Sequence, residues 1–237
     1  MLRNVPTLAA ISFFLAICLG SDSDALTTRV KEMKMINLPA PTLTSNVSIE
    51  ATIKARRSVR DFSSKSPTLK DMSQLLWAAQ GITSLEGLRT APSAGALYPL
   101  EIYLVAGSVK DLSPGVYRYV PGKPGLLTIK KGDHRTALAG AALSQQSIVT
   151  APASLVIAAV YLRTAIKYGK RAGNYICIEA GHAGQNILLQ ATARGLGSVV
   201  IGAFDEQNVQ QVLDLPTDHQ PISIIPTGFP RPPSPRR

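Results

Sequence analysis

The chain has 237 residues, of which 45% are hydrophobic and 17% charged, which suits one well-cored domain and excludes a disordered chain. Lys and Arg total 25 against 15 acidic residues, a formal charge of +10, so the partners it favours are anionic: nucleic acid, a membrane surface or a phosphorylated small molecule. After the first 20 residues, no apolar run approaches the roughly 18 residues that span a bilayer, so we expect no membrane span in the mature chain.

The N-terminus has the layout of a secretory signal peptide. Arg3 gives a basic start, residues 8–19 form an apolar core, and a polar SDSD stretch follows. A buried N-terminal helix is the alternative, and a lipoprotein anchor at Cys18 is a lesser one. We therefore expect residues 1–20 to be a signal peptide and the mature protein to be exported, either periplasmic or secreted.

Cleavage of this leader would leave Cys177 as the one remaining cysteine. The mature chain would then lack an internal disulfide, and its fold would depend on its core even in an oxidising compartment. Because Ile176 and Ile178 flank this thiol, we expect Cys177 to be packed and unreactive.

The body of the chain predicts a mixture of helices and strands. TLKD, from Thr68 to Asp71, is a capping box, and apolar residues then recur at helical spacing until Gly81. Residues 154–160 form a continuous apolar run, typical of a buried central strand. The turn PGKPG predicts a hairpin between residues 116–120 and 126–129. Further helices are expected over 48–60, 135–146 and 175–194, the last ended by Gly195, and further strands over 101–106, 198–201 and 222–225.

These elements predict an α+β fold, with a mixed, mostly antiparallel sheet flanked by helices, because the hairpin interrupts any strict alternation of strand and helix. No internal repeat is present. We expect a polar, proline-spotted, extended arm over residues 21–48, one domain over 49–230 and a basic, proline-rich tail over 231–237.

Several functional classes lack their sequence signals. His134, His182 and His219 are far apart and have no spaced Cys, His or carboxylate partners, so no metal site is predicted. A serine hydrolase is unsupported, because the chain has no nucleophile-elbow motif. GLGSVV ends a helix and does not open one, so it is no dinucleotide fingerprint. With only 5% aromatic residues and scattered Lys and Arg, nucleic-acid binding is not expected.

Three stretches are candidates for chemistry. ARRSVRDF puts Arg56, Arg57, Ser58 and Arg60 within five positions, a set that can bind one phosphate bidentately; a solvated basic face is an equally weighted alternative. APSAGALYPLE, over residues 91–101, combines proline with small side chains and lets the backbone approach a flat ligand, although it could be an ordinary loop. Small residues also recur in EAGHAGQNILLQATARGLGSVVIGAFD, and together the three favour a planar, phosphorylated ligand.

At these stretches the sequence resembles the nitroreductase family of FMN-dependent oxidoreductases, and within it the SagB-type dehydrogenases that oxidise azoline rings in peptide natural products. The matching text is RRSVRDF, MSQLLWAAQGIT, RTAPSAGALYPLEIYLV, KYGKRAGNYICIEAGHAGQNILLQATARGLGSVVIGAFD and PTGFP, in the family's order over roughly residues 50–230. The resemblance implies the nitroreductase-like fold, an interlocked homodimer and two FMN molecules at the dimer interface.

The resemblance also implies the reaction and the residues that hold FMN. Hydride would pass through the flavin from a reductant, with NADH or NADPH as the candidate donor, to a small organic or peptide-derived substrate, with ping-pong kinetics. The implied cofactor residues are Arg56, Arg57, Ser58, Arg60 and Arg231 for the phosphate, Pro92, Ser93, Ala94 and Gly95 along the isoalloxazine ring, and Gly202 and Ala203 as backbone donors near its redox-active nitrogen.

In the azoline-oxidising branch a neighbouring Lys–Tyr pair removes a proton, and Lys167–Tyr168 occupies the similar position. The alternative for Lys167 is a solvated loop. Two other readings of the whole chain stay open: a flavin-binding member without turnover, and a basic protein whose arginines bind a surface. Flavin absorbance in purified protein, and its bleaching by NADH or NADPH, would separate the three.

Overall fold

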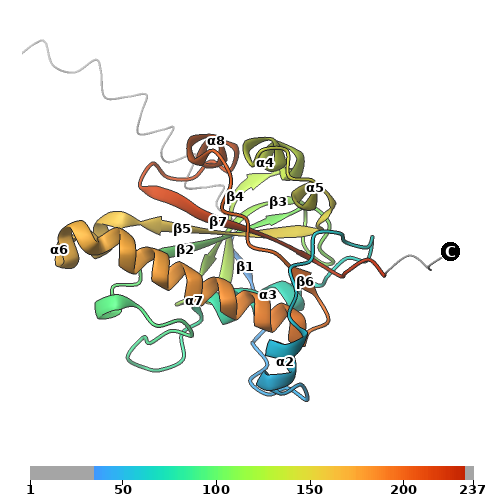
Figure 1. Ribbon diagram of the computed structural model, residues 1–237, viewed down its shortest axis with the longest axis horizontal. Coiled ribbons are helices and arrows are strands. Elements are labelled where there is room, and N and C mark those ends of the chain that lie inside the picture. The colour runs from blue at the N-terminus through green and yellow to red at the C-terminus, as the bar shows by residue number, and fades with distance from the viewer. Residues whose placement is uncertain (1–34, 233–237) are drawn as a thin grey trace, which may run out of the picture. The chain divides into compact units, whose positions relative to one another are not determined.

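The computed structural model describes residues 35–232, and these residues form an α+β domain built on a seven-stranded sheet (Figure 1). Within this part of the chain the strand order is β1-β4-β3-β2-β5-β7-β6, and every neighbouring pair is antiparallel. The strands are β1 (Met35–Asn37), β2 (Leu100–Ala106), β3 (Gly115–Val120), β4 (Gly125–Lys131), β5 (Ala153–Val160), β6 (Gly197–Ser198) and β7 (His219–Gly228). The predicted fold class is confirmed.

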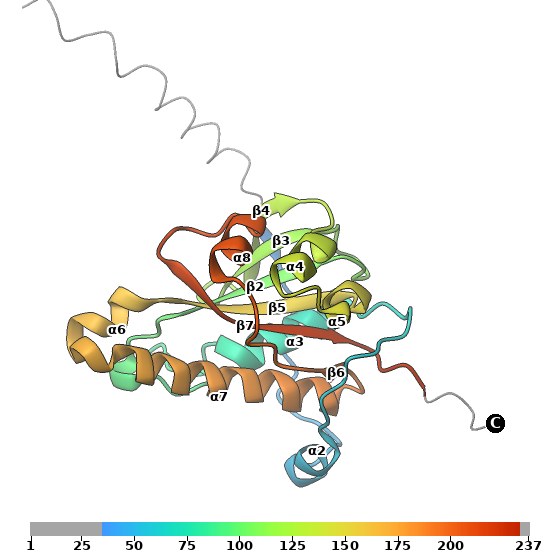
Figure 2. The ribbon, with the colours of Figure 1, turned by 45° about the horizontal axis from the view of Figure 1, so that its top comes forward.

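Helices cover both faces of the sheet, as Figures 1 and 2 show. α3 (Leu69–Gln80) and α7 (Ala172–Ala193) pack on one face, and α4 (Arg135–Ala141), α5 (Gln146–Thr150) and α8 (Glu206–Val212) pack on the other. α2 (Ile49–Ala55) lies against α7, and α6 (Tyr161–Tyr168) joins β5 to α7 through the short turns of η2 (Gly169–Arg171). A further 3₁₀ turn, η1 (Ala94–Ala96), precedes β2.

β5 is the centre of the sheet, as its apolar sequence predicts. All eight of its residues are buried between β2 and β7. Leu155 and Ile157 face the core under α3 and α7, whereas Val156 and Ala158 face the core under α4, α5 and α8. This alternation follows from the two-residue period of a strand. A strand that is apolar on both faces needs helices on both sides, and the fold supplies them.

α3 begins and ends where its sequence predicts. The Thr68 hydroxyl accepts a hydrogen bond from the Asp71 amide at 3.1 Å, and the Asp71 carboxylate accepts one from the Thr68 amide at 2.8 Å. Gly81 is the C-cap, and a side chain there would collide with the Trp77 ring. Asp71 is also paired with Arg194, at the end of α7, which joins the two helices of this layer.

α7 is the longest helix of the described chain and buries one face against the sheet through Ile176, Ala180 and Ile187. A methyl group on Gly184 would lie 3.9 Å from Ile157 and Ile225 of the sheet, an ordinary van der Waals contact, so this position does not require glycine. The helix ends before Gly195, whose φ of +72° is the left-handed conformation predicted for its cap.

Several local expectations are wrong. The helix predicted over 48–60 ends at Ala55, because Val59 donates its amide to Ser198 and the chain from Arg56 onward is extended. The helix predicted over 135–146 is divided into α4 and α5, since Leu143 and Ser144 have positive φ. Of the strand predicted over 198–201, only Ser198 belongs to a strand, at the end of β6. Ile201 forms an isolated bridge to Ile224 of β7.

Cys177 is exposed, which contradicts the prediction that its apolar neighbours bury it. Ile176 faces the sheet, but Ile178 is 55% exposed, because residues two apart on a helix point in different directions. In the segment predicted to be an arm, β1 pairs with β4 and so belongs to the sheet. The predicted leader lies outside the described residues, and none of the helices described is both long and apolar enough to cross a membrane.

Candidate functional site

The arginine segment, residues 56–60, runs along the edge of the sheet after α2 ends. The Val59 amide donates to the Ser198 carbonyl at 3.0 Å, and the Val59 side chain fills the space above Gly197. Arg57 turns back to α2, where its Nη1 donates to the carbonyls of Lys54 and Arg56 at 2.9 and 2.8 Å. Ser58 and Arg60 are exposed. The side chains of Ser58 and Arg60 therefore face solvent, while the backbone between them is held by the hydrogen bond of Val59.

Arg231 lies beside this segment, as the resemblance implies. Its amide donates to the Asp61 carbonyl at 3.1 Å, and its guanidinium contacts the Asp61 carboxylate at 3.0 Å. The chain after β7 is thus held against the chain after α2, where Phe62 and Pro230 form an isolated bridge. This ion pair with Asp61 partly neutralises the positive charge of Arg231.

Gly202 and Ala203 come from the same edge of the sheet. Ile201 exchanges both backbone hydrogen bonds with Ile224 of β7, at 2.8 and 2.9 Å, and the two small residues that follow are exposed. A methyl group on Gly202 would have no neighbour within 4 Å among the described residues. We call residues 56–60, 198–203 and 231 the phosphate half-site, after its arginines; Gly202 and Ala203 within it are the residues implied to donate near the redox-active nitrogen of the flavin.

The small-residue loop, residues 91–98, has a tightly constrained backbone. Gly95, Ala96 and Tyr98 have φ values of +64°, +55° and +46°, which non-glycine residues rarely adopt. The Ser93 hydroxyl accepts a hydrogen bond from the Tyr98 amide at 2.9 Å and closes the turn. Pro92 and Gly95 are exposed on it, and Ser93 and Ala94 are half-buried.

Lys167 and Tyr168 lie against this loop. A methyl group on Gly95 would be 2.9 Å from the Lys167 Nζ and 3.0 Å from the Tyr168 hydroxyl. Lys167 is in the last turn of α6 and not on a loop, and the Tyr168 ring packs on Tyr175 with 4.6 Å between ring centres. We call the 91–98 loop with Lys167 and Tyr168 the ring half-site.

Under the ring half-site lie residues that the sequence analysis did not identify. Glu179 of α7 is buried, and burial raises its pKa to about 7, against opposing effects of the Ser93 side chain and Arg89. Arg89 lies over the Tyr98 ring, 4.4 Å from its centre. Asn186 of α7 donates to the Thr90 carbonyl at 3.2 Å. The available signal was that Glu179 is the one acidic residue of α7.

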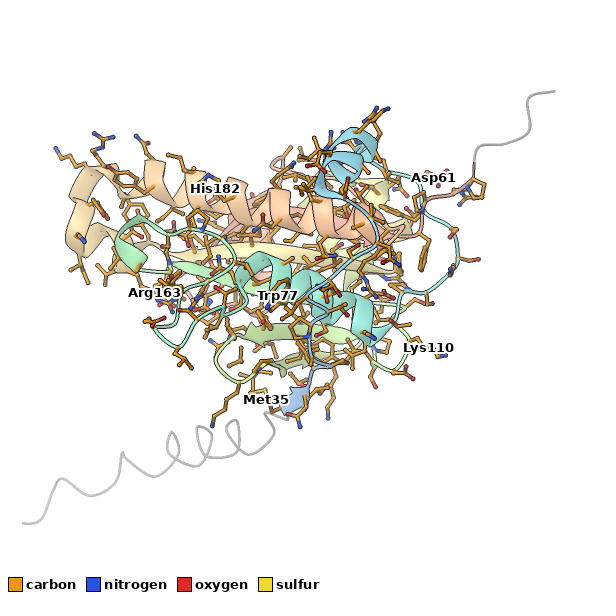
Figure 3. The ribbon with its side chains drawn as sticks, turned by 90° about the horizontal axis from the view of Figure 1, so that it is seen from below. Met35, Asp61, Trp77, Lys110, Arg163 and His182 are labelled. Carbon is orange, nitrogen blue, oxygen red and sulfur yellow. The ribbon has the colours of Figure 1, made fainter. Side chains whose placement is uncertain are left out.

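The two half-sites of one chain lie apart. Ser93 is near Glu179 in the first half of α7, whereas the phosphate half-site lies beyond its end, near Gly197. At 1.5 Å per residue, the helix rises about 20 Å between Glu179 and its last residue, Ala193. Figure 3 shows Arg163, beside the ring half-site, and Asp61, beside the phosphate half-site, at opposite ends of α7. One protomer does not bring the predicted residues together.

The residues of the two half-sites fit FMN, provided that different protomers hold its two ends. The phosphate half-site has exposed guanidinium and hydroxyl donors of the kind that bind phosphate bidentately. The ring half-site exposes the loop at Pro92 and Gly95, where a flat ring can approach the backbone, while Lys167 and Tyr168 fill the side-chain position of Gly95. Within residues 35–232, no group of three or more His, Cys, Asp or Glu could hold a metal ion.

Comparison with known proteins identifies the family of the chain. The model of the nitroreductase family matches residues 53–229, which contain the ring half-site and all of the phosphate half-site except Arg231. A protein of Methanocaldococcus jannaschii assigned to the nitroreductases is 41% identical over 182 residues, covering 77% of this chain and 91% of that one. A crystal structure from Anabaena variabilis, assigned likewise, superposes with a TM-score of 0.75 at 29% identity and covers 84% of this chain. The match covers only 42% of the Anabaena chain.

A more distant similarity is to a structure of the Escherichia coli microcin synthetase McbBCD complex with truncated pro-MccB17 bound. The TM-score is 0.66 at 21% identity, and the match covers 93% of this chain and 85% of that chain. At this identity the similarity concerns the fold alone. The family model covers residues 53–229 and the relative from Methanocaldococcus jannaschii covers 77% of this chain, so the chain belongs to the nitroreductase family.

Proposed function

We propose that the protein is an FMN-dependent oxidoreductase of the SagB type, acting as a homodimer on a small organic or peptide-derived substrate. The observation that carries this proposal is the contact of Gly95 with Lys167 and Tyr168. It joins the loop assigned to the flavin ring with the pair assigned to proton removal, although about 70 residues separate them in sequence. Lys167 itself is exposed, and its Nζ lies against the loop from the last turn of α6.

The residues of the chain have separate tasks in this reaction. FMN, when bound, supplies the two-electron chemistry, by accepting a hydride from one substrate and returning it to a second. Arg56, Ser58 and Arg60 would hold its phosphate, and the 91–98 loop of the partner subunit would lie along its ring. The Lys167 Nζ or the Tyr168 oxygen takes the proton that a substrate loses as its hydride leaves, so that a single bond becomes a double bond.

The substrate class rests on two supports of different weight. The McbBCD complex, which has this fold, was solved with a truncated pro-MccB17 chain bound, and this favours a peptide-derived substrate. The exposure of Pro92, Gly95 and Ala96 in the ring half-site makes this loop accessible to a bulky substrate. NADH or NADPH is the proposed electron donor that reduces the flavin. Export by the predicted leader belongs to the same proposal and is tested by the location of the mature protein.

The phosphate assignment is tested by replacing Arg56 and Arg60 together by Ala. We expect the affinity for FMN to fall at least a hundredfold, since each charge-assisted bond contributes roughly 1.5–3 kcal/mol. Fluorescence titration of FMN with the purified protein measures this. The matched control is Lys123→Ala in the β3–β4 turn, which removes a cation away from the site. Normal flavin affinity in the double variant would contradict the assignment.

The proton-transfer assignment is tested by Lys167→Met and Tyr168→Phe. We expect both variants to bind FMN normally and to be bleached by a nicotinamide, because neither change touches the phosphate half-site. Oxidation of an azoline-containing peptide should fall by about a hundredfold or more, the usual contribution of a general base. A flavin that binds but is never bleached by any donor would instead indicate a flavin-binding member without turnover.

A further inference from the structure

A carboxylate with unused hydrogen-bonding capacity lies beneath the 91–98 loop. Glu179 is 2% exposed, and neither of its oxygens has a hydrogen-bond partner among residues 35–232. Two donors of the same cluster, Arg89 Nε and Gln80 Nε2, are also buried without a partner there, although Arg89 Nη1 donates to Gln80 Oε1 at 2.8 Å. Unpaired buried polar groups are costly and uncommon, so acceptors and donors left unused side by side require an explanation.

The loop above this cluster depends on Ser93. The Ser93 oxygen accepts from the Tyr98 amide and holds together a turn with positive φ at Ala96 and Tyr98. The hydroxyl hydrogen is free to point the other way, toward Glu179, whose pKa the Ser93 side chain lowers. A chain of bonds from the Tyr98 amide through the Ser93 hydroxyl to the Glu179 carboxylate is therefore available, and each bond would strengthen the next.

The charged groups around Glu179 come from three other elements. Glu101 of β2 is paired with Arg163 of α6 at 2.7 Å, and Arg163 also donates to the Tyr98 carbonyl. Arg89, from the loop after α3, interacts with Glu179, Glu101 and Arg163 and lies over the Tyr98 ring. Glu101 forms its ion pair with Arg163, and Arg89 is the cation whose charge acts on Glu179.

We propose that Glu179 is a positioning residue for the 91–98 loop. In its ionised state the carboxylate accepts a hydrogen bond from the Ser93 hydroxyl and draws in the Arg89 Nε–H, which fixes the turn that presents Gly95 to Lys167 and Tyr168. The assignment of this loop to the flavin ring rests on the proposed function. The role of Glu179 in holding the loop does not depend on flavin. Since burial raises the pKa of Glu179 to about 7, the two states of the loop exchange near neutral pH.

Hydrogen exchange of the loop amides tests the inference without flavin. In the full chain, after correction for intrinsic rates, protection of the Tyr98 amide should be about tenfold greater at pH 8 than at pH 6, the effect of one charge-assisted bond. Glu179→Gln and Ser93→Ala should each abolish this difference. The control is Glu206→Gln, an exposed carboxylate on α8, which should keep it. Equal protection at both pH values in the unsubstituted chain would overturn the inference.

FMN affinity is the second readout, and it separates this inference from the proposed function. Between pH 6 and pH 8 the dissociation constant of FMN should fall severalfold more in the unsubstituted chain than in Glu179→Gln, in which the second ionisation of the FMN phosphate alone contributes. An unchanged pH dependence in Glu179→Gln would overturn the inference while leaving the flavin site in place. A chain that binds no FMN at any pH would refute the proposed function, yet a pH-dependent loop in that chain would still support the role of Glu179.

Discussion

At the scale of single residues, the buried Glu179 lowers the stability of the fold when it is ionised, and it lies beneath the 91–98 loop of the ring half-site. Burial raises the pKa of its carboxyl group to about 7, from an ordinary value of 4.5. The folded chain therefore binds more protons than the unfolded chain between these two pH values, and the free energy of unfolding falls as the pH rises through that window. Below about pH 4.5 and above about pH 7 this contribution is constant. Such costs are common where a buried group serves a site.

We predict that Glu179→Gln stabilises the fold at pH 8 and leaves it unchanged at pH 4.5. The free energy of unfolding at pH 8 should rise by roughly 1–3 kcal/mol, because a neutral amide replaces a buried carboxylate. Denaturant unfolding at the two pH values measures this, with Glu206→Gln as the control. An equal effect of Glu179→Gln at both pH values would show that ionisation of Glu179 does not matter.

At the scale of secondary-structure elements, the N-terminus of α3 joins the two helices of one layer. Burial alone would raise the pKa of Asp71, but hydrogen bonds from Thr68 and Arg194 outweigh burial and lower it. The same carboxylate thus completes the capping box and pairs with the end of α7. The cap of α3 therefore stabilises this helical layer without contacting either half-site.

We predict that Thr68→Ala lowers the free energy of unfolding by about 1 kcal/mol, as the loss of an N-cap does. FMN affinity measured well below the midpoint of unfolding should not change, since Thr68 is outside both half-sites. Thr217→Ala, in the exposed loop before β7, is the control and should change neither quantity. A loss of flavin affinity in Thr68→Ala without a loss of stability would contradict this separation of roles.

At the scale of the whole molecule, the separation of the two half-sites along α7 predicts that a complete site needs two protomers. A twofold dimer contains each contact twice, so it would hold two such sites. The outer face of α7, with Ile178 exposed and no neighbour within 4 Å of a methyl group on Gly181, is available for a second helix. An apolar side chain beside a glycine allows two helices to approach closely.

Complementation between protomers tests this arrangement. Chains with Arg56→Ala and Arg60→Ala, and chains with Gly95→Leu, should each bind no FMN alone. After they are refolded together in equal amounts, roughly a quarter of the normal flavin should bind, because half of the dimers are mixed and each of these has one intact site. Absorbance at the flavin bands after gel filtration measures this. Flavin binding that never exceeds that of the separate variants would show that one protomer holds both ends.

The sequence alone determined much of this protein. The apolar run of β5, the capping box of α3 and the glycine after α7 are local patterns, and the structure confirms each of them. They predict the elements because hydrogen bonding and side-chain periodicity act over a few residues. The ordered motifs of the resemblance identified the nitroreductase family, which the family model confirms.

Only the tertiary structure decided how the motifs are grouped. It ended α2 at Ala55, because the pairing of Val59 with Ser198 outweighs local helix propensity. It brought Gly95 to Lys167 and Tyr168, and it buried Glu179 beneath their loop while leaving Cys177, two residues earlier on the same helix, exposed. These outcomes depend on contacts between segments that are far apart in sequence, and no local pattern of residues contains them.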